Sequence, residues 1–179
     1  MRPALTKRRN NERGFSLLEM MLATIILLVG IVAIAQLVPA SILMNYRNRN
    51  DSSALVFAQR ELDQFIDQPL SLTVPFTDAL GQTCSLGNPA SPNIVQGSPV
   101  LLFNNQAIID FGSAPVTNFS FTYLEDPADP TSTTYDVRWA VILTGNGSSV
   151  YSKRFILGVR QQGGNGYFQP ITLDTMVQK

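Results

Sequence analysis

The sequence predicts an α+β fold in which a long amino-terminal helix packs, by its second half, on an antiparallel β-sheet. Residues 15–38 are apolar, residues 54–66 repeat apolar side chains at helical spacing, and residues beyond about 100 alternate apolar and polar side chains. A helix that is apolar all round requires lipid or other helices, whereas a helix with one apolar stripe requires a protein surface. The chain therefore divides into a leader (1–14), an apolar helix (15–38), an amphipathic continuation (39–68) and a β-rich head domain (69–179).

The apolar segment is long enough to cross a bilayer. At about 1.5 Å per residue, a helix over residues 15–38 extends about 36 Å, against a hydrocarbon core of roughly 30 Å. Glu19 is the only formally charged residue in this segment. A carboxylate is costly in hydrocarbon unless it meets a partner. The sequence therefore predicts a transmembrane helix whose acidic residue pairs with a positive group.

The charges are unevenly distributed, although the chain has 13 basic and 13 acidic residues. The leader carries one acidic side chain, Glu12, and five basic ones, which are Arg2, Lys7, Arg8, Arg9 and Arg13. A basic segment before a membrane span favours a cytoplasmic location for that end of the chain. The remainder has no basic stripe of the kind that nucleic acid requires. We therefore expect a single-pass membrane protein with a cytoplasmic amino terminus and no nucleic-acid partner.

Composition argues against catalysis and against a disulfide. The chain has one cysteine, Cys84, and no histidine. An intrachain disulfide is therefore impossible, and the commonest general base and metal ligand is missing. Serine and acidic residues are present, but neither a Gly-x-Ser-x-Gly elbow nor a phosphate-binding glycine loop accompanies them. We expect a protein that is not an enzyme, with no cofactor and no catalytic or metal site.

Pro39 interrupts the long helix, because proline lacks a donor N–H and clashes with the preceding turn. The sequence predicts a kink or a local break there. The second half of the helix should stop at Gln68, since the residue before Pro69 is disfavoured in helical conformation. Helical spacing predicts a single apolar stripe on this half, formed by Leu55, Ala58, Leu62, Phe65 and Ile66.

The rest of the chain is predicted to be loops followed by strands. Proline and glycine punctuate residues 69–99, which leaves room for one short strand at 72–76. Later strands are predicted at 100–103, 107–111, 116–124, 135–143 and 150–160, with a short edge strand at 167–168 or 171–173. The turn at 104–106 joins the first two of these strands as a hairpin.

Alternation assigns the faces of the two longest strands. In the first, one face holds Tyr135, Val137, Trp139, Val141 and Leu143, and the other holds Asp136, Arg138 and Ala140. In the second, the apolar face holds Tyr151, Phe155, Leu157 and Val159. One apolar and one polar face predict an antiparallel sheet that is covered on a single side, by the amphipathic half of the helix.

A short motif opens the apolar segment and carries a resemblance. Arg13-Gly14-Phe15-Ser16-Leu17-Leu18-Glu19 places a glycine, an aromatic residue and a glutamate, in that order, between a basic leader and an apolar helix. This arrangement resembles the processing signal of type IV pilins and type II secretion pseudopilins, over about Lys7 to Val38. The resemblance implies a pilin-like fold, cleavage by prepilin peptidase between Gly14 and Phe15, methylation of Phe15, and a role for Glu19 in assembly.

The same resemblance implies a structural function. The missing disulfide departs from many major pilins and, with the two long alternating strands, favours a minor pilin or pseudopilin of a type IV pilus or type II secretion filament. The implied partners are other pilin or pseudopilin subunits, prepilin peptidase, inner-membrane lipid and the assembly platform. The mature protein would then reach a pilus or a periplasmic pseudopilus. The residues are equally compatible with a surface pilus, a secretion pseudopilus and a DNA-uptake filament.

The partner of Glu19 stays open at this point. Phe15 and Glu19 lie one helical turn apart, so the amine created by cleavage can pair with the carboxylate of its own chain. The amine of an adjacent subunit is the other candidate, and that pair would set the axial register of a filament. In either case an amine and a carboxylate that are poorly solvated gain more by pairing than they would in water.

Other interpretations of the anchor are also open. Ala33-Ile34-Ala35 fits the small-x-small site of a secretory signal, although the apolar segment exceeds the roughly 7–15 residues of such signals. The segment can also be an uncleaved anchor for an extracytoplasmic binding module that does not polymerise. In that case the acidic turn Glu125–Asp129, with Asp136 nearby, is a candidate for calcium binding through carboxylate oxygens. A solvated turn is the simpler interpretation of these acidic residues.

Overall fold

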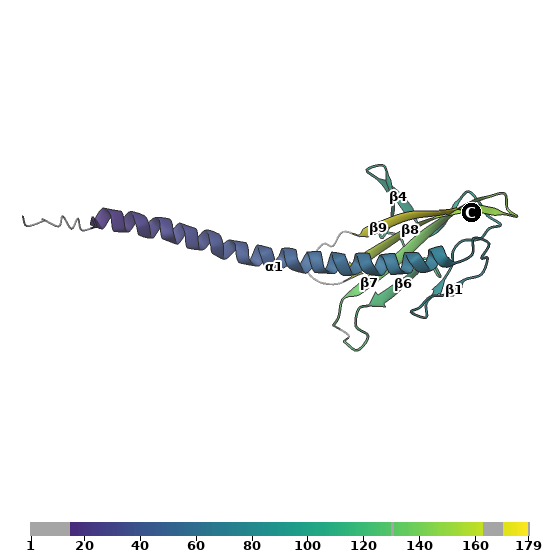
Figure 1. Cartoon of the computed structure of the whole chain (residues 1–179), viewed down its shortest axis with the longest axis horizontal. Coiled ribbons are helices and arrows are strands. Elements are labelled where there is room, and N and C mark those ends of the chain that lie inside the picture. Colours follow the sequence, from purple (N-terminus) through teal and green to yellow (C-terminus); the bar gives the residue numbers. More distant parts are fainter. Residues whose placement is uncertain (1–14, 130, 163–169, 179) are drawn as a thin grey trace, which may run out of the picture. The chain divides into compact units, whose positions relative to one another are not determined.

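The structure, a computed structural model, describes residues 15–129, 131–162 and 170–178. The chain forms two compact units, residues up to 45 and residues from 46 onward. Helix α1 (Leu17–Asp67) runs through both units, and the strands that follow belong to the second (Figure 1). The leader at 1–14 and the predicted edge strand at 167–168 lie outside the described residues.

The first unit consists of the apolar half of α1. Its large apolar side chains, from Phe15 to Met44, are exposed. Helix α1 continues through Pro39, so the local break predicted there does not form, and the kink stays a prediction. The hydroxyl groups of Thr24 and Ser41 donate hydrogen bonds to the carbonyl oxygens four residues earlier, at 2.7 and 2.9 Å. These bonds satisfy the hydroxyls within the helix itself, as an apolar environment requires.

The second half of α1 buries one stripe, as predicted, but the stripe is rotated toward Ala54 and Phe57. Ala58, Leu62 and Phe65 are buried as expected. Leu55 is not, because 39% of its surface stays exposed, so its assignment to the stripe was wrong. The full set of buried residues on α1 is Asn50, Ala54, Phe57, Ala58, Glu61, Leu62 and Phe65. The helix ends at Asp67, one residue before the predicted stop.

In the described residues, five strands form the main antiparallel sheet. Strand β7 is central: β8 pairs with one of its edges, while β3 and β6 share the other, and β9 follows β8. The strands are β3 (Val95–Gly97), β6 (Ser120–Leu124), β7 (Thr134–Gly145), β8 (Val150–Gln162) and β9 (Ile171–Gln178). Two hairpins stand beside the sheet, β1 (Phe76–Thr77) with β2 (Thr83–Cys84), and β4 (Val100–Phe103) with β5 (Gln106–Ile109).

The predicted strands beyond residue 100 are confirmed, with ends that differ by a few residues. The hairpin turn between β4 and β5 is made by Asn104 and Asn105, whose φ angles are 48° and 63°. Asparagine tolerates this left-handed conformation better than most residues. The prediction for residues 69–99 was less accurate. This segment contains β1, β2 and β3, and pairing begins at Phe76 rather than at residue 72.

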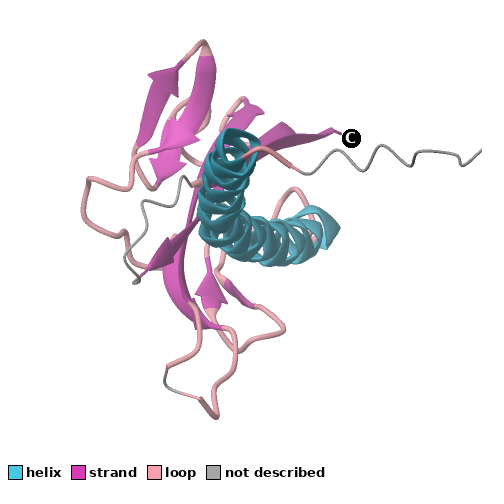
Figure 2. Ribbon diagram, turned by 90° about the vertical axis from the view of Figure 1, so that its left-hand side faces the viewer, coloured by secondary structure: helices cyan, strands magenta, loops and turns pink. Residues whose placement is uncertain are grey.

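The main core lies between the sheet and the second half of α1 (Figure 2). Tyr135, Val137, Trp139, Val141 and Leu143 face it and are buried, as alternation predicted. Phe65 from α1 contacts Phe76, Trp139 and Phe155, with ring centroids 5.0–6.0 Å apart. Trp139 Nε1 donates a hydrogen bond to the Ser85 carbonyl oxygen at 2.8 Å. The apolar stripe of the helix and the apolar face of the sheet therefore bury each other.

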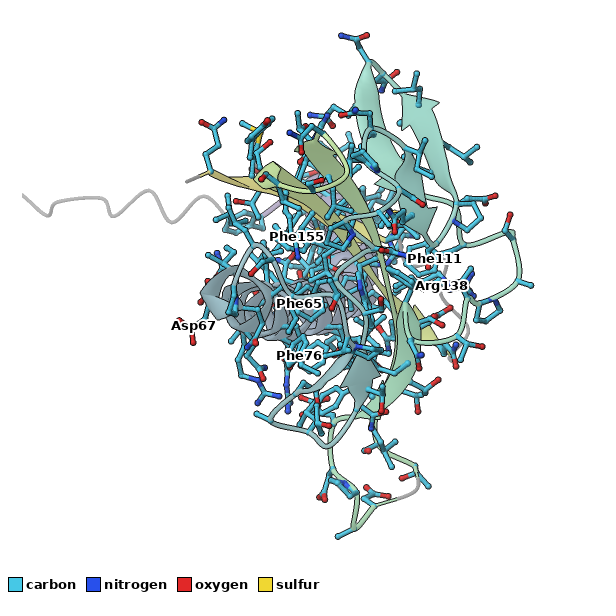
Figure 3. The ribbon with its side chains drawn as sticks, turned by 90° about the vertical axis from the view of Figure 1, so that its right-hand side faces the viewer. Phe65, Asp67, Phe76, Phe111, Arg138 and Phe155 are labelled. Atoms are coloured by element: carbon cyan, nitrogen blue, oxygen red, sulfur yellow. The ribbon has the colours of Figure 1, made fainter. Side chains whose placement is uncertain are left out.

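The opposite face of the sheet is also covered, which corrects the prediction of a single covered side. Ile109, Ala140 and Ile156 form a second buried cluster, against which Val100 and Phe111 pack. Figure 3 shows Phe111 and Arg138 on this side, across the sheet from Phe65, Phe76 and Phe155. The β4–β5 hairpin and the segment after it supply this cover. Because that cover comes from neighbouring loops, alternation along β7 did not reveal it.

The polar residues of β7 are buried with partners on this second face. Asp136 accepts hydrogen bonds from Arg138, at 2.9 Å from both Nε and Nη2, and from Arg160 Nη2 at 3.1 Å. Arg138 also donates to the Ser113 carbonyl oxygen at 2.6 Å. Both guanidinium groups lie over the ring of Phe111, 5.2 and 4.7 Å from its centroid. The charges of Asp136, Arg138 and Arg160 therefore have partners within the fold, although alternation had predicted that this face of β7 is exposed to solvent.

Tyr151 was wrongly placed on the apolar face of β8. A register shift between Thr144 and Gly145 leaves Tyr151 unpaired, since Ser152 pairs with Thr144 and Val150 with Gly145. Tyr151 is 54% exposed, whereas Val150 packs against the main core. A bulge that inserts one residue reverses the faces beyond it. Lys153 takes the inward position that simple alternation gives to this end of the strand, and it is buried.

Gly158 permits the close packing of the second face. A Cβ atom there would lie 2.8 Å from Ile109 Cβ and 3.0 Å from the Phe111 ring. We expect Gly158→Ala to lower the free energy of unfolding by about 1–3 kcal/mol, the usual range for overpacking. Trp139 is the one tryptophan of the chain, so its fluorescence can follow denaturation. Thr172→Ala, at the residue paired with Gly158 on β9, is the control and should change stability by no more than about 0.5 kcal/mol.

Because Lys153 is buried, we expect the free energy of unfolding to depend on pH. Lys153 Nζ donates one long hydrogen bond, 3.5 Å, to the Leu72 carbonyl oxygen. Burial lowers its pKa from 10.5 to about 8. Below pH 8 both the folded and the unfolded chain carry the proton, so folding bears the full cost of burying the charge. Between pH 8 and 10.5 only the unfolded chain keeps the proton, and this cost is relieved as pH rises.

We therefore expect Lys153→Met to be more stable than the wild type below pH 8, by about 3 kcal/mol for a shift of this size. The advantage should shrink steadily between pH 8 and 10. Denaturation of both proteins across this range measures it, and the difference between them cancels contributions from other titrating groups. An advantage that does not change with pH would contradict the prediction.

The contact between α1 and the β1–β2 hairpin is polar and buried. Glu61 on α1 is fully buried, its Oε1 accepts a hydrogen bond from Arg60, and burial raises its pKa. The Cys84 thiol donates a weak hydrogen bond to Asp78 Oδ2 at 3.9 Å. Burial, reinforced by the nearby negative charges of Asp78 and Glu61, raises the pKa of this thiol to about 12. Cys84 is therefore a protonated thiol enclosed in the fold.

Candidate functional site

The candidate site is the start of α1, where the short motif meets the apolar helix. The helix begins at Leu17. The Met20 N–H donates a backbone hydrogen bond to the carbonyl oxygen of Ser16, the residue before the helix, at 3.1 Å. Phe15 precedes the helix and is 82% exposed. Gly14 lies outside the described residues. The motif therefore changes from non-helical to helical backbone within two residues of Phe15.

Glu19 lies in the first turn of α1. This position is favourable for a carboxylate, because the unpaired N–H groups at a helix start carry partial positive charge. Glu19 is exposed, and within the part of the chain that the structure describes its carboxylate has no hydrogen bond or ion pair. It is thus available to a positive group that approaches the helix start.

Apart from Glu19, the first turns of α1 are mainly apolar, and they carry a groove that Glu19 does not line. Leu17, Met20, Met21, Thr24 and Ile25 line a shallow groove of about 380 Å³ on the helix. Helix α1 is long and apolar enough to cross a membrane, and the apolar stretch that qualifies it is not buried within the protein. The helix start therefore combines a carboxylate that has no partner among the described residues with a surface that requires lipid or other helices.

Comparison with protein-family models gives a match at this end of the chain. Residues 9–35 match the family model of the prokaryotic N-terminal methylation motif. The chain carries the amino-terminal signal of type IV pilins and pseudopilins. The match covers the last six residues of the leader, Phe15, Glu19 and most of the apolar half of α1. A search of curated proteins and a search of solved structures gave no significant match.

The pilin-type signal has general consequences. It supports a pilin-like chain of the kind that prepilin peptidase processes, and in general it implies association with other pilin subunits. The exposed apolar half of α1 is consistent with membrane anchoring, as such a signal requires. The long helix and the antiparallel sheets agree with the α+β, pilin-like fold that the resemblance implied.

The acidic turn does not assemble a ligand set. Asp126 Oδ1 accepts a hydrogen bond from Ala128 N–H at 2.9 Å, and Asp129 Oδ1 accepts two from Thr131. Asp136 is held by its two arginines in the second face of the sheet. Among the residues that the structure describes, no three carboxylate, thiol or imidazole side chains come together as metal ligands. The carboxylates of Asp126 and Asp129 instead accept hydrogen bonds from backbone N–H groups of the turn.

Sequence reasoning located the helix-start residues but missed a second feature. In its described part, the main sheet ends at β9 on one side and at β6, with the short β3 beyond it along β7, on the other, and each of these strands pairs on one edge only. Alternation identifies the strands without giving their order in the sheet, so the sequence contained no signal for which edges stay open.

Proposed function

We propose that this chain is a minor pilin or pseudopilin, a structural subunit of a type IV pilus or type II secretion filament. It is inserted in the inner membrane with its leader in the cytoplasm, cut between Gly14 and Phe15, and methylated on Phe15. The pilin-type signal at the start of an exposed apolar helix carries this proposal. Removal of the basic leader takes away the charges that favour a cytoplasmic location for this end.

Glu19 connects processing to assembly in this proposal. Cleavage creates a positive amine on Phe15 within or at the edge of the apolar zone, and neighbouring subunits can place such an amine beside Glu19. Pairing in poorly solvated surroundings is favourable because each charge alone is strongly destabilised there. The exposed carboxylate in the first turn of α1, which has no partner among residues 15–129, 131–162 and 170–178, supports this role. The filament then forms by packing of the apolar halves of the helices, with the pair fixing their axial register.

We further propose that the protein has no enzymatic activity of its own. The absence of histidine and the use of Asp136, Arg138 and Trp139 in packing support this proposal. The second unit then acts as the structural head of the subunit. Its partners are other pilin or pseudopilin subunits, prepilin peptidase, membrane lipid and the assembly platform.

Determination of the mature amino terminus tests the proposed function. Protein purified from membranes or filaments is expected to begin at Phe15, and its amino-terminal peptide should carry the mass of one added methyl group. A Gly14→Leu variant is expected to keep the leader. A protein that keeps its leader, or that begins near Gln36 as a secretory signal would leave it, would overturn the proposal.

A further inference from the structure

The main sheet of the second unit has two open edges. Strand β6 pairs with β7 and strand β9 pairs with β8, and in the described residues neither strand is paired on its other edge. No backbone hydrogen bond from the loops reaches residues 171–178. An open edge presents a row of N–H and C=O groups that another strand can pair with.

The edge of β6 is accompanied by an apolar groove. The groove has a volume of about 380 Å³ and lies between β6 and the second half of α1. Val56, which is 66% exposed, lines it with Phe57 and Tyr123, whose rings stack 4.2 Å apart. Arg60 and Glu125 are the charged residues of its lining. A strand added beside β6 would direct every second side chain into this groove.

Strand β9 has the properties of such an added strand. Its helix-side residues Ile171, Leu173 and Val177 pack against the main core yet stay only partly buried. Strand β9 contains neither lysine nor proline, the residues that commonly protect an edge. Its one charge, Asp174, forms an ion pair with Arg154 of β8. No uncompensated charge on β9 therefore opposes pairing with a second strand.

The strand directions make the two edges compatible. Each neighbour in the order β6–β7–β8–β9 is antiparallel to the next, so β9 runs opposite to β6. When two copies lie side by side in the same orientation, β9 of one therefore meets β6 of the next as an antiparallel pair. Their helix-side faces also lie on the same side of the joined sheet. The two surfaces differ, so the contact is heterologous and leaves a free edge for a further copy.

We propose that β9 of one copy of this chain adds to the β6 edge of a second copy, with its helix-side apolar residues in the groove beside Val56 and Tyr123. This inference rests on the proposed function, since a filament holds its subunits in a common orientation. It adds a contact between sheet edges to the contact between helices. The joined sheet continues antiparallel from one head to the next.

Cysteine cross-linking of the full-length chain tests the proposed contact. Thr122→Cys places a thiol on β6, on the face of the sheet that points away from α1. On the same face of β9, the four test substitutions are Thr172→Cys, Asp174→Cys, Met176→Cys and Gln178→Cys. Native Cys84 is buried and gives little background. Two chains of different tag length, one with the β6 substitution and one with a β9 substitution, are expressed together and oxidised in intact membranes or filaments.

Directly opposed residues in an antiparallel pair have Cβ atoms about 4.5–5.5 Å apart, whereas diagonal ones lie about 7–8 Å apart. Only directly opposed cysteines suit a disulfide. We therefore expect one β9 position to give a mixed dimer several times more abundant than the others. Leu102→Cys, at the 82% exposed tip of the β4–β5 hairpin, is the control and should not form a mixed dimer. Val56→Glu in the chain with the β6 substitution should abolish the mixed dimer by placing a charge in the groove.

The same samples separate this inference from the proposed function, because filament content and the mature amino terminus are measured in parallel. Mature chains that enter filaments without a mixed dimer at any of the four β9 positions would overturn the edge contact and leave the proposed function standing. A disulfide to a different subunit instead of a second copy would also overturn it. Unprocessed chains outside filaments, with no mixed dimer, would overturn both.

Discussion

A Glu19→Ala variant is expected to reach the membrane at the wild-type level, to be processed, and to fail to assemble. The substitution removes the carboxylate from the first turn of α1 and leaves a subunit amine without a partner in apolar surroundings. Breaking a buried ion pair in this way costs about 3–5 kcal/mol, which is on the order of a hundredfold or more in the assembly equilibrium. The ratio of protein in sheared filaments to protein in the membrane fraction measures the effect.

Two variants control this result. Glu19→Asp keeps the charge and should retain part of the assembly, whereas Thr24→Ala, about one turn further along the same helix, should assemble normally. The Thr24 hydroxyl donates a hydrogen bond within its own helix, to the Met20 carbonyl oxygen. Unchanged filament incorporation of Glu19→Ala would reject the pairing role while leaving the membrane anchor intact.

An Asp136→Ala variant is expected to lose about 3–5 kcal/mol of folding free energy, the cost of removing one partner from a buried ion pair. Asp136 is buried and holds both Arg138 and Arg160. Its removal leaves the buried guanidinium of Arg138 without a carboxylate, although the Ser113 carbonyl oxygen and the ring of Phe111 remain. Denaturation followed by Trp139 fluorescence measures the loss.

The exposed pair on the neighbouring strand provides a matched control. Asp174 and Arg154 form an ion pair of the same type, and both side chains are partly exposed to solvent. An exposed pair contributes about 0–1 kcal/mol, so Asp174→Ala should change stability little. Equal losses in the two variants would show that burial is not what makes the Asp136 cluster important.

The parts of this molecule that local pattern determines could be predicted from the sequence. A run of apolar residues around one carboxylate predicted the exposed half of α1, and alternation placed Trp139 and its neighbours in the core. The short motif around Phe15 predicted the pilin-type signal that the family comparison found. In each case the residues that carry the signal are adjacent, or repeat with the period of one element.

The features that the prediction missed depend on contacts between distant segments. Asp136 and Arg138 are buried because Phe111 and Ser113, in the segment after the β4–β5 hairpin, cover this face, whereas polar alternation had placed them in solvent. Tyr151 is exposed because a bulge changes the register of β8. Leu55 is exposed because α1 turns Ala54 and Phe57 toward the sheet. Each outcome is decided by a neighbour that lies far along the chain.

The enclosed thiol has a consequence for how the protein matures. Thiolate is the reactive form of cysteine, and a buried group that titrates near pH 12 has almost none of it at physiological pH. The folded chain should therefore pass through an oxidising compartment without mispairing with other proteins. Its maturation would then be independent of disulfide-forming catalysts, and its yield should not change in cells that lack them.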